Sequence, residues 1–265
     1  MKRELEVALD LAKRAGTEAW RIQRRGELGV ELKQGEEPVT VADKLASELI
    51  VDGLTKAFPG DPLISEEMPP APGALGSARL WFVDPIDGTK DFIRGSDGFS
   101  IMIGLVIAGR PAVGVVHQPA TPRTFWASPD GAFVDGKPLS VSDIADPGAA
   151  RLVASASHRT ADIDRVKQTL GIADEQNVGS VGVKLCMIAA GLRDLYVNPA
   201  TRTKAWDTCA PEAILVPAGG RLSDLFGSPL DYTRELAHRR GLVASNGHVH
   251  DEVIAKLAPL FASLA

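Results

Sequence analysis

One stretch of the chain organises the rest: Trp81-Phe82-Val83-Asp84-Pro85-Ile86-Asp87-Gly88-Thr89-Lys90-Asp91-Phe92. Its apolar start predicts a strand over residues 80–83 that delivers Asp84 to its C-terminal end. Pro85 presets a bend and Gly88 permits unusual backbone angles. The carboxylates of Asp84 and Asp87, three residues apart, can therefore converge on one point. Thr89 would begin a helix whose free backbone N–H groups face that point, which suits a phosphate beside a metal.

Two further segments place carboxylates at the ends of predicted elements. Ser65-Glu66-Glu67 directly follows the short apolar run Leu63-Ile64, so both glutamates stand where a strand is expected to end. Thr40 is a candidate N-cap, which puts Asp43 at the third position of the next predicted helix. A carboxylate is favoured there because it opposes the positive end of the helix dipole.

A fourth segment is Ala205-Trp206-Asp207-Thr208-Cys209-Ala210-Pro211. Proline is tolerated in the first turn of a helix, so Pro211 predicts a helix start near Asp207. Taken alone, Asp207 is explained as a helix cap, and the Asp84 to Gly88 string as an ordinary turn. Four such segments in one chain make a shared acidic site the better interpretation.

A cluster of these groups would need cations. Two carboxylates about 4 Å apart repel by roughly 4 kcal/mol at an effective dielectric constant near 20. Oxygen ligands select Mg²⁺ or Mn²⁺ over zinc. Phosphate-loop, nucleophile-elbow and HExxH patterns are absent from the sequence. We interpret His248 and His250 as surface histidines near a helix start.

The rest of the pattern predicts an α+β first half and a smaller α/β second half. A long amphipathic helix is expected over residues 4–24, and a meandering sheet over residues 80–83, 99–107, 112–117 and 124–127. Turns are expected at Gly109-Arg110 and Asp135-Gly136. Later strands are expected over residues 152–155, 195–197 and 242–244, with helices between them and after His250.

Composition limits the class of protein. The chain has 265 residues, of which 45% are hydrophobic and 24% charged, as in a globular protein with a real core. Its net charge of −5 argues against a nucleic-acid partner. No segment approaches the roughly 20 apolar residues of a membrane span. The cysteines, Cys186 and Cys209, have neither metal-ligand nor disulfide spacing. We expect a cytoplasmic protein without membrane contact, and favour a monomer over a homodimer.

The ordered set of motifs resembles the lithium-sensitive, inositol monophosphatase-like phosphatase superfamily. The resemblance rests on Asp43, Glu66-Glu67, Asp84-Pro85-Ile86-Asp87-Gly88-Thr89 and Trp206-Asp207, and it covers essentially the whole chain. Within the superfamily, the chain is most similar to the 3'(2'),5'-bisphosphate nucleotidases. That similarity rests on Lys90-Asp91-Phe92, Thr208-Cys209-Ala210-Pro211-Glu212, Gly219-Gly220-Arg221-Leu222-Ser223-Asp224 and Leu230-Asp231-Tyr232.

The resemblance implies a layered αβαβα sandwich of the sugar-phosphatase type. It implies an N-terminal lobe over residues 1–150 with most metal ligands, and a C-terminal lobe over residues 151–265 with Asp207 and substrate recognition. The implied ligands of two or three Mg²⁺ ions, for which Mn²⁺ could substitute, are Glu66, Asp84, the Ile86 carbonyl, Asp87 and Asp207. Asp43 and Thr89 match the pair that orients and deprotonates the attacking water. Glu67 matches the second acidic position, which we interpret as support for the metal ligands.

Substrate contacts are implied by shorter and looser matches. Gly88 and Thr89 would bind the phosphate, and Ser155, His158, Ser180 and Lys184 would lie near the nucleotide. Two positions depart from the pattern: Ser65 stands where glycine is common, and Arg159 has no clear counterpart.

The implied activity is hydrolysis of adenosine 3',5'-bisphosphate to AMP and phosphate by metal-activated water. An inositol or sugar phosphatase of the same superfamily is the alternative enzyme. A binding module whose acidic cluster merely holds a structural cation is a third reading, but such a module has no need of the water-activating pair Asp43 and Thr89.

Overall fold

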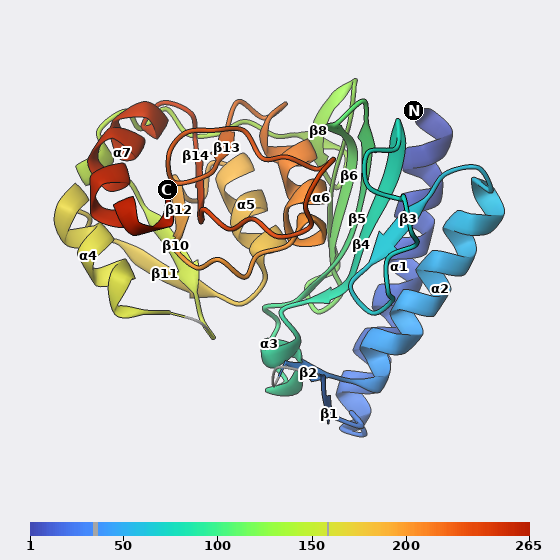
Figure 1. Cartoon of the computed structure of the whole chain (residues 1–265). Helices are drawn as coiled ribbons and strands as arrows, with labels where there is room; N and C mark the ends of the chain where they lie inside the picture. The colour runs from blue at the N-terminus through green and yellow to red at the C-terminus, as the bar shows by residue number, and fades with distance from the viewer. Residues whose placement is uncertain (34–36, 158) are drawn as a thin grey trace.

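The computed structural model describes residues 1–33, 37–157 and 159–265. Two β-sheets stand side by side with helices outside and between them, which gives five layers in the order αβαβα (Figure 1). This confirms the predicted fold class. No helix in the described ranges is both long and apolar enough to cross a membrane.

The larger sheet has the strand order β3-β4-β5-β6-β7-β8-β9. Only β3 and β4 are parallel, and the remaining neighbours form the predicted antiparallel meander. The strands are β3 (Leu63–Ser65), β4 (Arg79–Asp87), β5 (Ser100–Ile107), β6 (Arg110–Gln118), β7 (Arg123–Ser128), β8 (Gly131–Val134) and β9 (Lys137–Pro138). Its outer face is covered by α1 (Lys2–Arg25) and α2 (Val41–Ala57).

The smaller sheet has the order β11-β10-β12-β14-β13. Its strands are β10 (Leu152–Ser155), β11 (Glu175–Val178), β12 (Leu195–Asn198), β13 (Arg221–Ser223) and β14 (Leu242–Ser245). Helices α5 (Val181–Ala189) and α6 (Ala205–Leu215) fill the layer between the sheets, while α4 (Ala161–Leu170) and α7 (His250–Leu257) cover the far face (Figure 1). Two 3₁₀ helices span Pro147–Ala149 and Ala258–Leu264.

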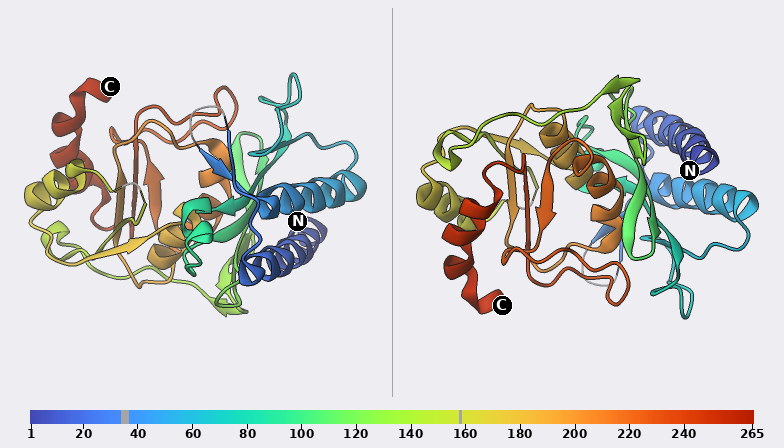
Figure 2. Two further views of the ribbon diagram at one scale, coloured as in Figure 1. Left: turned by 90° about the horizontal axis from the view of Figure 1, so that it is seen from below. Right: turned by 90° about the horizontal axis from the view of Figure 1, so that it is seen from above.

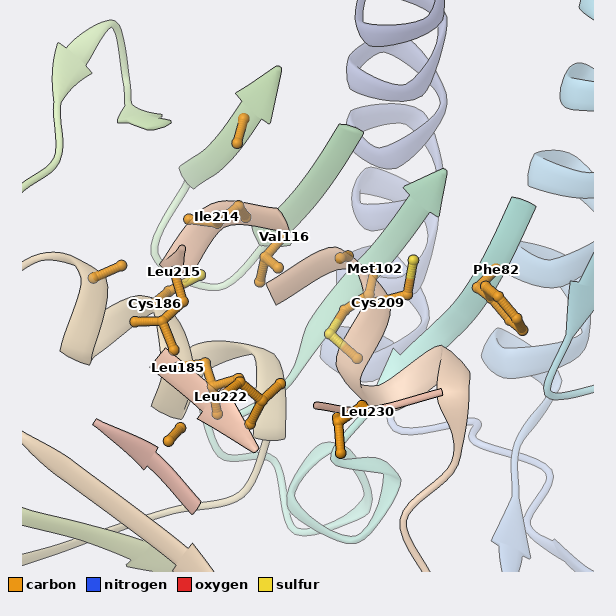
Figure 3. Packing of buried hydrophobic residues seen from close by; sticks show 14 of the residues in the cluster. Phe82, Met102, Val116, Leu185, Cys186, Cys209, Ile214, Leu215, Leu222 and Leu230 are labelled. Atoms are coloured by element: carbon orange, nitrogen blue, oxygen red, sulfur yellow. The ribbon is translucent and has the colours of Figure 1, made fainter. Parts of the chain in front are cut away.

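Alternation along β4 shows why the sheet is buried on both faces. Leu80 and Phe82 belong to the central core between the sheets, whereas Trp81 and Val83 belong to the outer core under α1 and α2. Side chains of a strand point alternately to its two faces, so each strand here needs apolar residues at every position. The central core collects residues from both sheets and from α5 and α6 (Figure 3).

Two short elements lie at one end of the molecule. These are the hairpin of β1 (Glu31–Leu32) and β2 (Pro38–Val39), and the helix α3 (Thr89–Ile93). They contact each other, and α3 lies in the space between the two sheets when the molecule is seen from below (Figure 2). This end carries the candidate site.

The structure corrects some details of the sequence analysis. β4 does not stop at Asp84 but continues to Asp87, with a shift of register between these two residues. The bend at Pro85 is therefore a bulge inside a strand. His250 is buried rather than on the surface, 2.9 Å from Ser223 Oγ through Nε2 and 2.9 Å from Ser245 Oγ through Nδ1.

The division into lobes at residue 150 stays a prediction. The larger sheet ends at Pro138 and the smaller one begins at Leu152, which agrees with that boundary. The central core, however, contains residues from both sides of it.

Helix α6 approaches the larger sheet unusually closely because two paired residues lack side chains. Gly104 and Gly114 lie opposite each other on β5 and β6. A Cβ atom on Gly104 would lie 2.6 Å from Cys209 Sγ, and one on Gly114 would lie 2.2 Å from Ala210 O. Both distances are far shorter than a van der Waals contact, so the glycines set the position of α6.

We expect Gly114→Ala to lower the free energy of unfolding by about 1–3 kcal/mol, because the backbone of α6 must move to admit the methyl group. Urea denaturation measures this. Gly60→Ala is the control: no atom lies within 4 Å of its Cβ position, and the effect should stay within about 0.5 kcal/mol. Equal stability of the two variants would contradict the close approach of α6.

Candidate active site

The structure brings the predicted acidic residues of all four segments together. Burial raises the pKa of Asp84 well above its usual value, and the charges of Glu66, Asp87, Asp207 and Asp43 raise it further, in that order. Burial likewise raises the pKa of Asp207, followed by the charges of Asp87 and Glu66. These effects require the carboxylates to be neighbours, although they come from β3, β4, α2 and α6.

Asp84 is the least satisfied member of the cluster. Its side chain is 1% exposed, and its Oδ1 atom is buried with no hydrogen-bond partner among the described residues. A buried carboxylate oxygen without a partner is costly. A bound cation would remove that cost.

Asp43 combines a helix cap with the predicted catalytic position. Its Oδ2 atom accepts hydrogen bonds from the Thr40 N–H at 2.7 Å and the Thr40 hydroxyl at 2.5 Å, which confirms the predicted N-cap. Its Oδ1 atom lies 3.2 Å from Thr89 Oγ1. Thr89 Oγ1 is also 3.1 Å from the Ile86 carbonyl, and its one proton can go to only one of these acceptors at a time. Burial raises the pKa of Asp43 to about 6.

Asp87 is held by the start of α5. Its Oδ2 atom accepts hydrogen bonds from the Ser180 hydroxyl at 2.5 Å and the Gly182 N–H at 2.7 Å. Ser180 is also the N-cap of α5, since its Oγ atom accepts the Val183 N–H at 3.0 Å. One hydroxyl therefore ties a strand of the larger sheet to a helix of the central layer.

Asp207 stands at the third position of α6, as Asp43 does in α2. Its Oδ2 atom accepts the Lys204 N–H at 2.7 Å. The helix does begin near Asp207, but Pro211 lies in its second turn and not in the first. The sequence argument from Pro211 was wrong, because this proline does not mark the first turn. Proline has no N–H, so the helix lacks only the hydrogen bond from residue 211 to the Asp207 carbonyl.

Glu66 is engaged by a residue that sequence reasoning missed. Lys33 Nζ lies 3.0 Å from Glu66 Oε1 and 2.5 Å from Glu67 Oε1. Burial disfavours the charged form of Lys33, but the two carboxylates outweigh it and raise the pKa of Lys33 above its usual range. Burial raises the pKa of Glu66 to about 7, against the opposing charge of Lys33. No spacing in the sequence links Lys33 to a segment more than thirty residues away.

The predicted substrate residues divide into three groups. Gly88 and Thr89 are partly exposed at the start of α3, and Gly88 adopts φ 96°, where a Cβ atom would lie 3.0 Å from Gly98 O. Ser155 lines a cavity of about 80 Å³ between the end of β10, the end of β12 and the start of α4. His158 lies outside the described residues.

Ser180 and Lys184 form the third group and lie behind Asp87. They are 0% and 1% exposed. Lys184 Nζ donates to the carbonyls of Val178 at 3.1 Å and Gly179 at 2.7 Å and lies 5.3 Å from the Tyr196 ring centre. Burial lowers the pKa of Lys184 to about 8, against the opposing charges of Asp87, Asp91 and Asp207. Their contact with substrate stays a prediction, and their positions favour support of Asp87.

One departure from the superfamily pattern has a local explanation. Ser65, where glycine is common, is buried and shares a hydrogen bond of 2.8 Å with Ser47 of α2. The other, Arg159, forms ion pairs with Glu175 at 2.6 Å and Asp164 at 2.5 Å. Arg159 is therefore paired with carboxylates of α4 and β11.

The donors of the cluster fit Mg²⁺. All of them are oxygens, and the unpartnered Asp84 Oδ1 is the kind of atom that a hard cation takes as a ligand. As they stand, however, no three His, Cys, Asp or Glu side chains among the described residues surround one point closely enough to hold an ion. The carboxylates are neighbours, but they do not surround one point as the ligands of a bound ion would. One of them, Glu66, accepts a hydrogen bond from Lys33 instead.

Comparison with known proteins identifies the family of the chain. A model of the inositol monophosphatase family matches residues 1–260. The chain is 35% identical over 235 residues to the 3'(2'),5'-bisphosphate nucleotidase CysQ of Salmonella typhimurium, covering 86% of this chain and 94% of that protein. It is 36% identical over 264 residues to the histidinol-phosphatase of Mycobacterium tuberculosis, covering 96% and 97%. An IMPase structure from Thermotoga maritima matches with a TM-score of 0.86 and 28% identity over 100% of both chains.

The five-layered fold and the match to phosphatases over most of the chain define a phosphatase of the inositol monophosphatase type. This chain belongs to the inositol monophosphatase family, as its motifs predicted. Phosphatases of this family are generally Mg²⁺-dependent.

The crowding of the carboxylates leads to a prediction for the metal-free protein. We expect Asp84→Asn to raise its free energy of unfolding by about 1 kcal/mol or more at pH 7.5, because folding then requires neither a buried repelling charge nor the uptake of a proton at this position. A carboxyl group whose pKa is raised by folding binds its proton more tightly in the folded state, so the wild type loses stability as pH rises. Asp43 and Glu66, with pKa values of about 6 and 7, place this loss between about pH 4 and 7.

The gain in Asp84→Asn should therefore shrink at pH 5, where the remaining carboxyl groups carry protons. Calorimetry in EDTA at both pH values measures it. His117, His238 and His250, whose pKa values burial lowers to about 4, change stability in the opposite sense but equally in both proteins. A variant less stable than wild type at both pH values would contradict the clustering.

The burial of Lys184 leads to a second prediction. We expect Lys184→Met to lower kcat/KM for monophosphorylated and bisphosphorylated substrates by the same factor, because Lys184 supports Asp87 rather than the substrate. The free energy of unfolding should fall by about 1–3 kcal/mol, since the Gly179 carbonyl loses its Lys184 donor, whereas the Val178 carbonyl keeps the Ala156 N–H. A selective loss toward the bisphosphorylated substrate would show that Lys184 reaches the ligand.

Proposed function

We propose that this protein is a Mg²⁺-dependent 3'(2'),5'-bisphosphate nucleotidase that hydrolyses adenosine 3',5'-bisphosphate to AMP and phosphate. The observation that carries the proposal is the meeting of the acidic cluster with Thr89 and Asp43 in a phosphatase that is 35% identical to a nucleotidase of that kind. Glu66, Asp84, the Ile86 carbonyl, Asp87 and Asp207 are the residues that would hold the metal.

A structural link between two nucleotidase-like segments supports this branch of the family. Tyr232 donates its hydroxyl proton to Glu212 and lies 3.1 Å from Thr208 Oγ1. Tyr232 comes from the Leu230-Asp231-Tyr232 segment. Thr208 and Glu212 belong to α6, and Thr208 directly follows Asp207. Two of the four segments that resemble nucleotidases thus form one buried hydrogen-bonded unit that begins next to Asp207.

Proton transfer in the proposed reaction is assigned to Thr89 and Asp43. Mg²⁺ would neutralise charge on the phosphate and lower the pKa of the attacking water. The water would give its proton to Thr89 Oγ1 as Thr89 passes its own to Asp43 Oδ1, 3.2 Å away. Asp43, with a pKa of about 6, suits a general base near neutral pH, and Thr40 fixes its second oxygen.

A second candidate is hydrolysis of histidinol phosphate. The Mycobacterium tuberculosis relative matches 264 residues of alignment against 235 for the nucleotidase, at nearly the same identity. Both activities would use the same cluster and differ only in recognition. Inositol and sugar phosphates remain the further alternative.

Release of phosphate from four substrates tests the proposal: adenosine 3',5'-bisphosphate, adenosine 3'-monophosphate, histidinol phosphate and inositol 1-phosphate. We expect kcat/KM to be highest for the bisphosphate by about tenfold or more, equivalent to ~1.4 kcal/mol of transition-state binding. EDTA should abolish release from every substrate, and excess Mg²⁺ should restore it. A preference for histidinol phosphate would replace the proposed substrate, and release that is indifferent to EDTA would overturn the metal mechanism.

A further inference from the structure

Helix α3 presents a cation at the end opposite to its phosphate-facing residues. Thr89 begins the helix beside Asp43, and Arg94 closes it, with its N–H bonded to the Lys90 carbonyl. Five helical residues span about 7.5 Å.

The side chain of Arg94 is exposed, and no carboxylate of the described residues forms an ion pair with its guanidinium. It donates through Nη1 to Ser157 Oγ at 3.1 Å. No ion pair within residues 1–33, 37–157 and 159–265 includes Arg94. Its basic neighbours differ: Lys33 is paired with Glu66 and Glu67, and Arg159 with Asp164 and Glu175.

Ser157 is itself held in place, so Arg94 has a fixed partner. The Ser157 hydroxyl donates to Asp91 Oδ2 at 2.8 Å and accepts from Arg94. Asp91 is buried and also accepts the Ser96 hydroxyl at 3.2 Å. Gly179 makes room for this carboxylate, because a Cβ atom there would lie 2.1 Å from Asp91 Oδ2.

The chain Asp91–Ser157–Arg94 crosses from α3 of the larger lobe to the segment after β10 of the smaller one. Ser155, predicted to lie near the nucleotide, is the last residue of β10 and precedes Ser157 by two positions. Only one of the five N–H donors of Arg94 is taken by Ser157, which leaves the planar fork that suits two oxygens of a phosphate.

We propose that Arg94 binds the second phosphate of the substrate, the one that is not hydrolysed, with Ser157 and Asp91 as positioning residues. This inference rests on the proposed nucleotidase activity and identifies the residue that makes a bisphosphate preferable to a monophosphate. A histidinol or inositol monophosphate has no group to offer Arg94.

The test compares adenosine 3',5'-bisphosphate with adenosine 3'-monophosphate, which share the scissile phosphate and differ only in the second one. The measured quantity is the ratio of the two kcat/KM values. We expect Arg94→Gln to lower this ratio about 10- to 150-fold, the effect of losing a hydrogen bond to a charged group. Arg94→Lys keeps a point charge without the fork and should lose less. Ser157→Ala should fall between wild type and Arg94→Gln.

Arg110→Gln is the matched control. Arg110 is also exposed and outside every ion pair of the described ranges, but it borders a cavity at the C-terminal half of α6, with Glu212 and Val216. Its ratio should equal that of the wild type, and thermal melting confirms that each variant is folded.

Three results would overturn the assignment of Arg94: an unchanged ratio in Arg94→Gln, an equal loss on both substrates, or the same change in Arg110→Gln. A wild-type ratio near one would overturn the proposed nucleotidase activity as well. A wild-type preference that survives in Arg94→Gln would overturn the role of Arg94 alone.

Discussion

Like charges confined to one buried place determine how this molecule is built. Asp43 and Asp207 stand in the first turns of α2 and α6 and accept the N–H groups of the N-cap residues Thr40 and Lys204. Asp87, at the end of β4, accepts the Gly182 N–H at the start of α5. A carboxylate at a helix N-terminus gains about 0.3–1 kcal/mol from the dipole, and more where it is partly buried. Asp84 has no such partner, so the repulsion is least relieved at the atom best placed to ligate a cation.

This arrangement explains why the layers lie where they do. Three helix starts can meet at one point only if α5 and α6 run between the sheets and α2 reaches the same end from outside (Figure 1). The close packing of α6 on Gly104 and Gly114 then fixes Asp207 relative to β4 and β5. The packing of the central core and the geometry of the site therefore depend on each other. A larger side chain at Gly104 or Gly114 would push α6 away from the sheet and would move Asp207 with it.

Features encoded within a few residues could be predicted from the sequence, and features that depend on distant contacts could not. The Thr40 cap, the acidic ends of β3 and β4 and the Asp135-Gly136 turn follow from local chemistry, and the last shows the positive φ angles that such a turn requires. Motif order also indicated that the acids meet. Nothing local reveals that Lys33 reaches Glu66, or that Ser180 turns inward to Asp87. The bulge in β4 and the place of Pro211 depend on tertiary packing that overrides the usual preference of proline.

The distribution of positive charge separates metal chemistry from substrate recognition. Lys33 and Lys184 lie against the acidic cluster, where they offset carboxylates and have little charge left for a ligand. A protein with a net charge of −5 attracts a polyanionic substrate only where a basic side chain is not neutralised by a neighbouring carboxylate of the protein. Arg94 meets that condition because the hydroxyl of Ser157, and not a carboxylate, holds it. Thr89 and Arg94 flank one short helix, so the backbone fixes the separation of their Cα atoms; under the proposed assignment, α3 would set the spacing between the reacting phosphate and the second one. Under this assignment, selectivity for a bisphosphate requires no change in the acidic cluster.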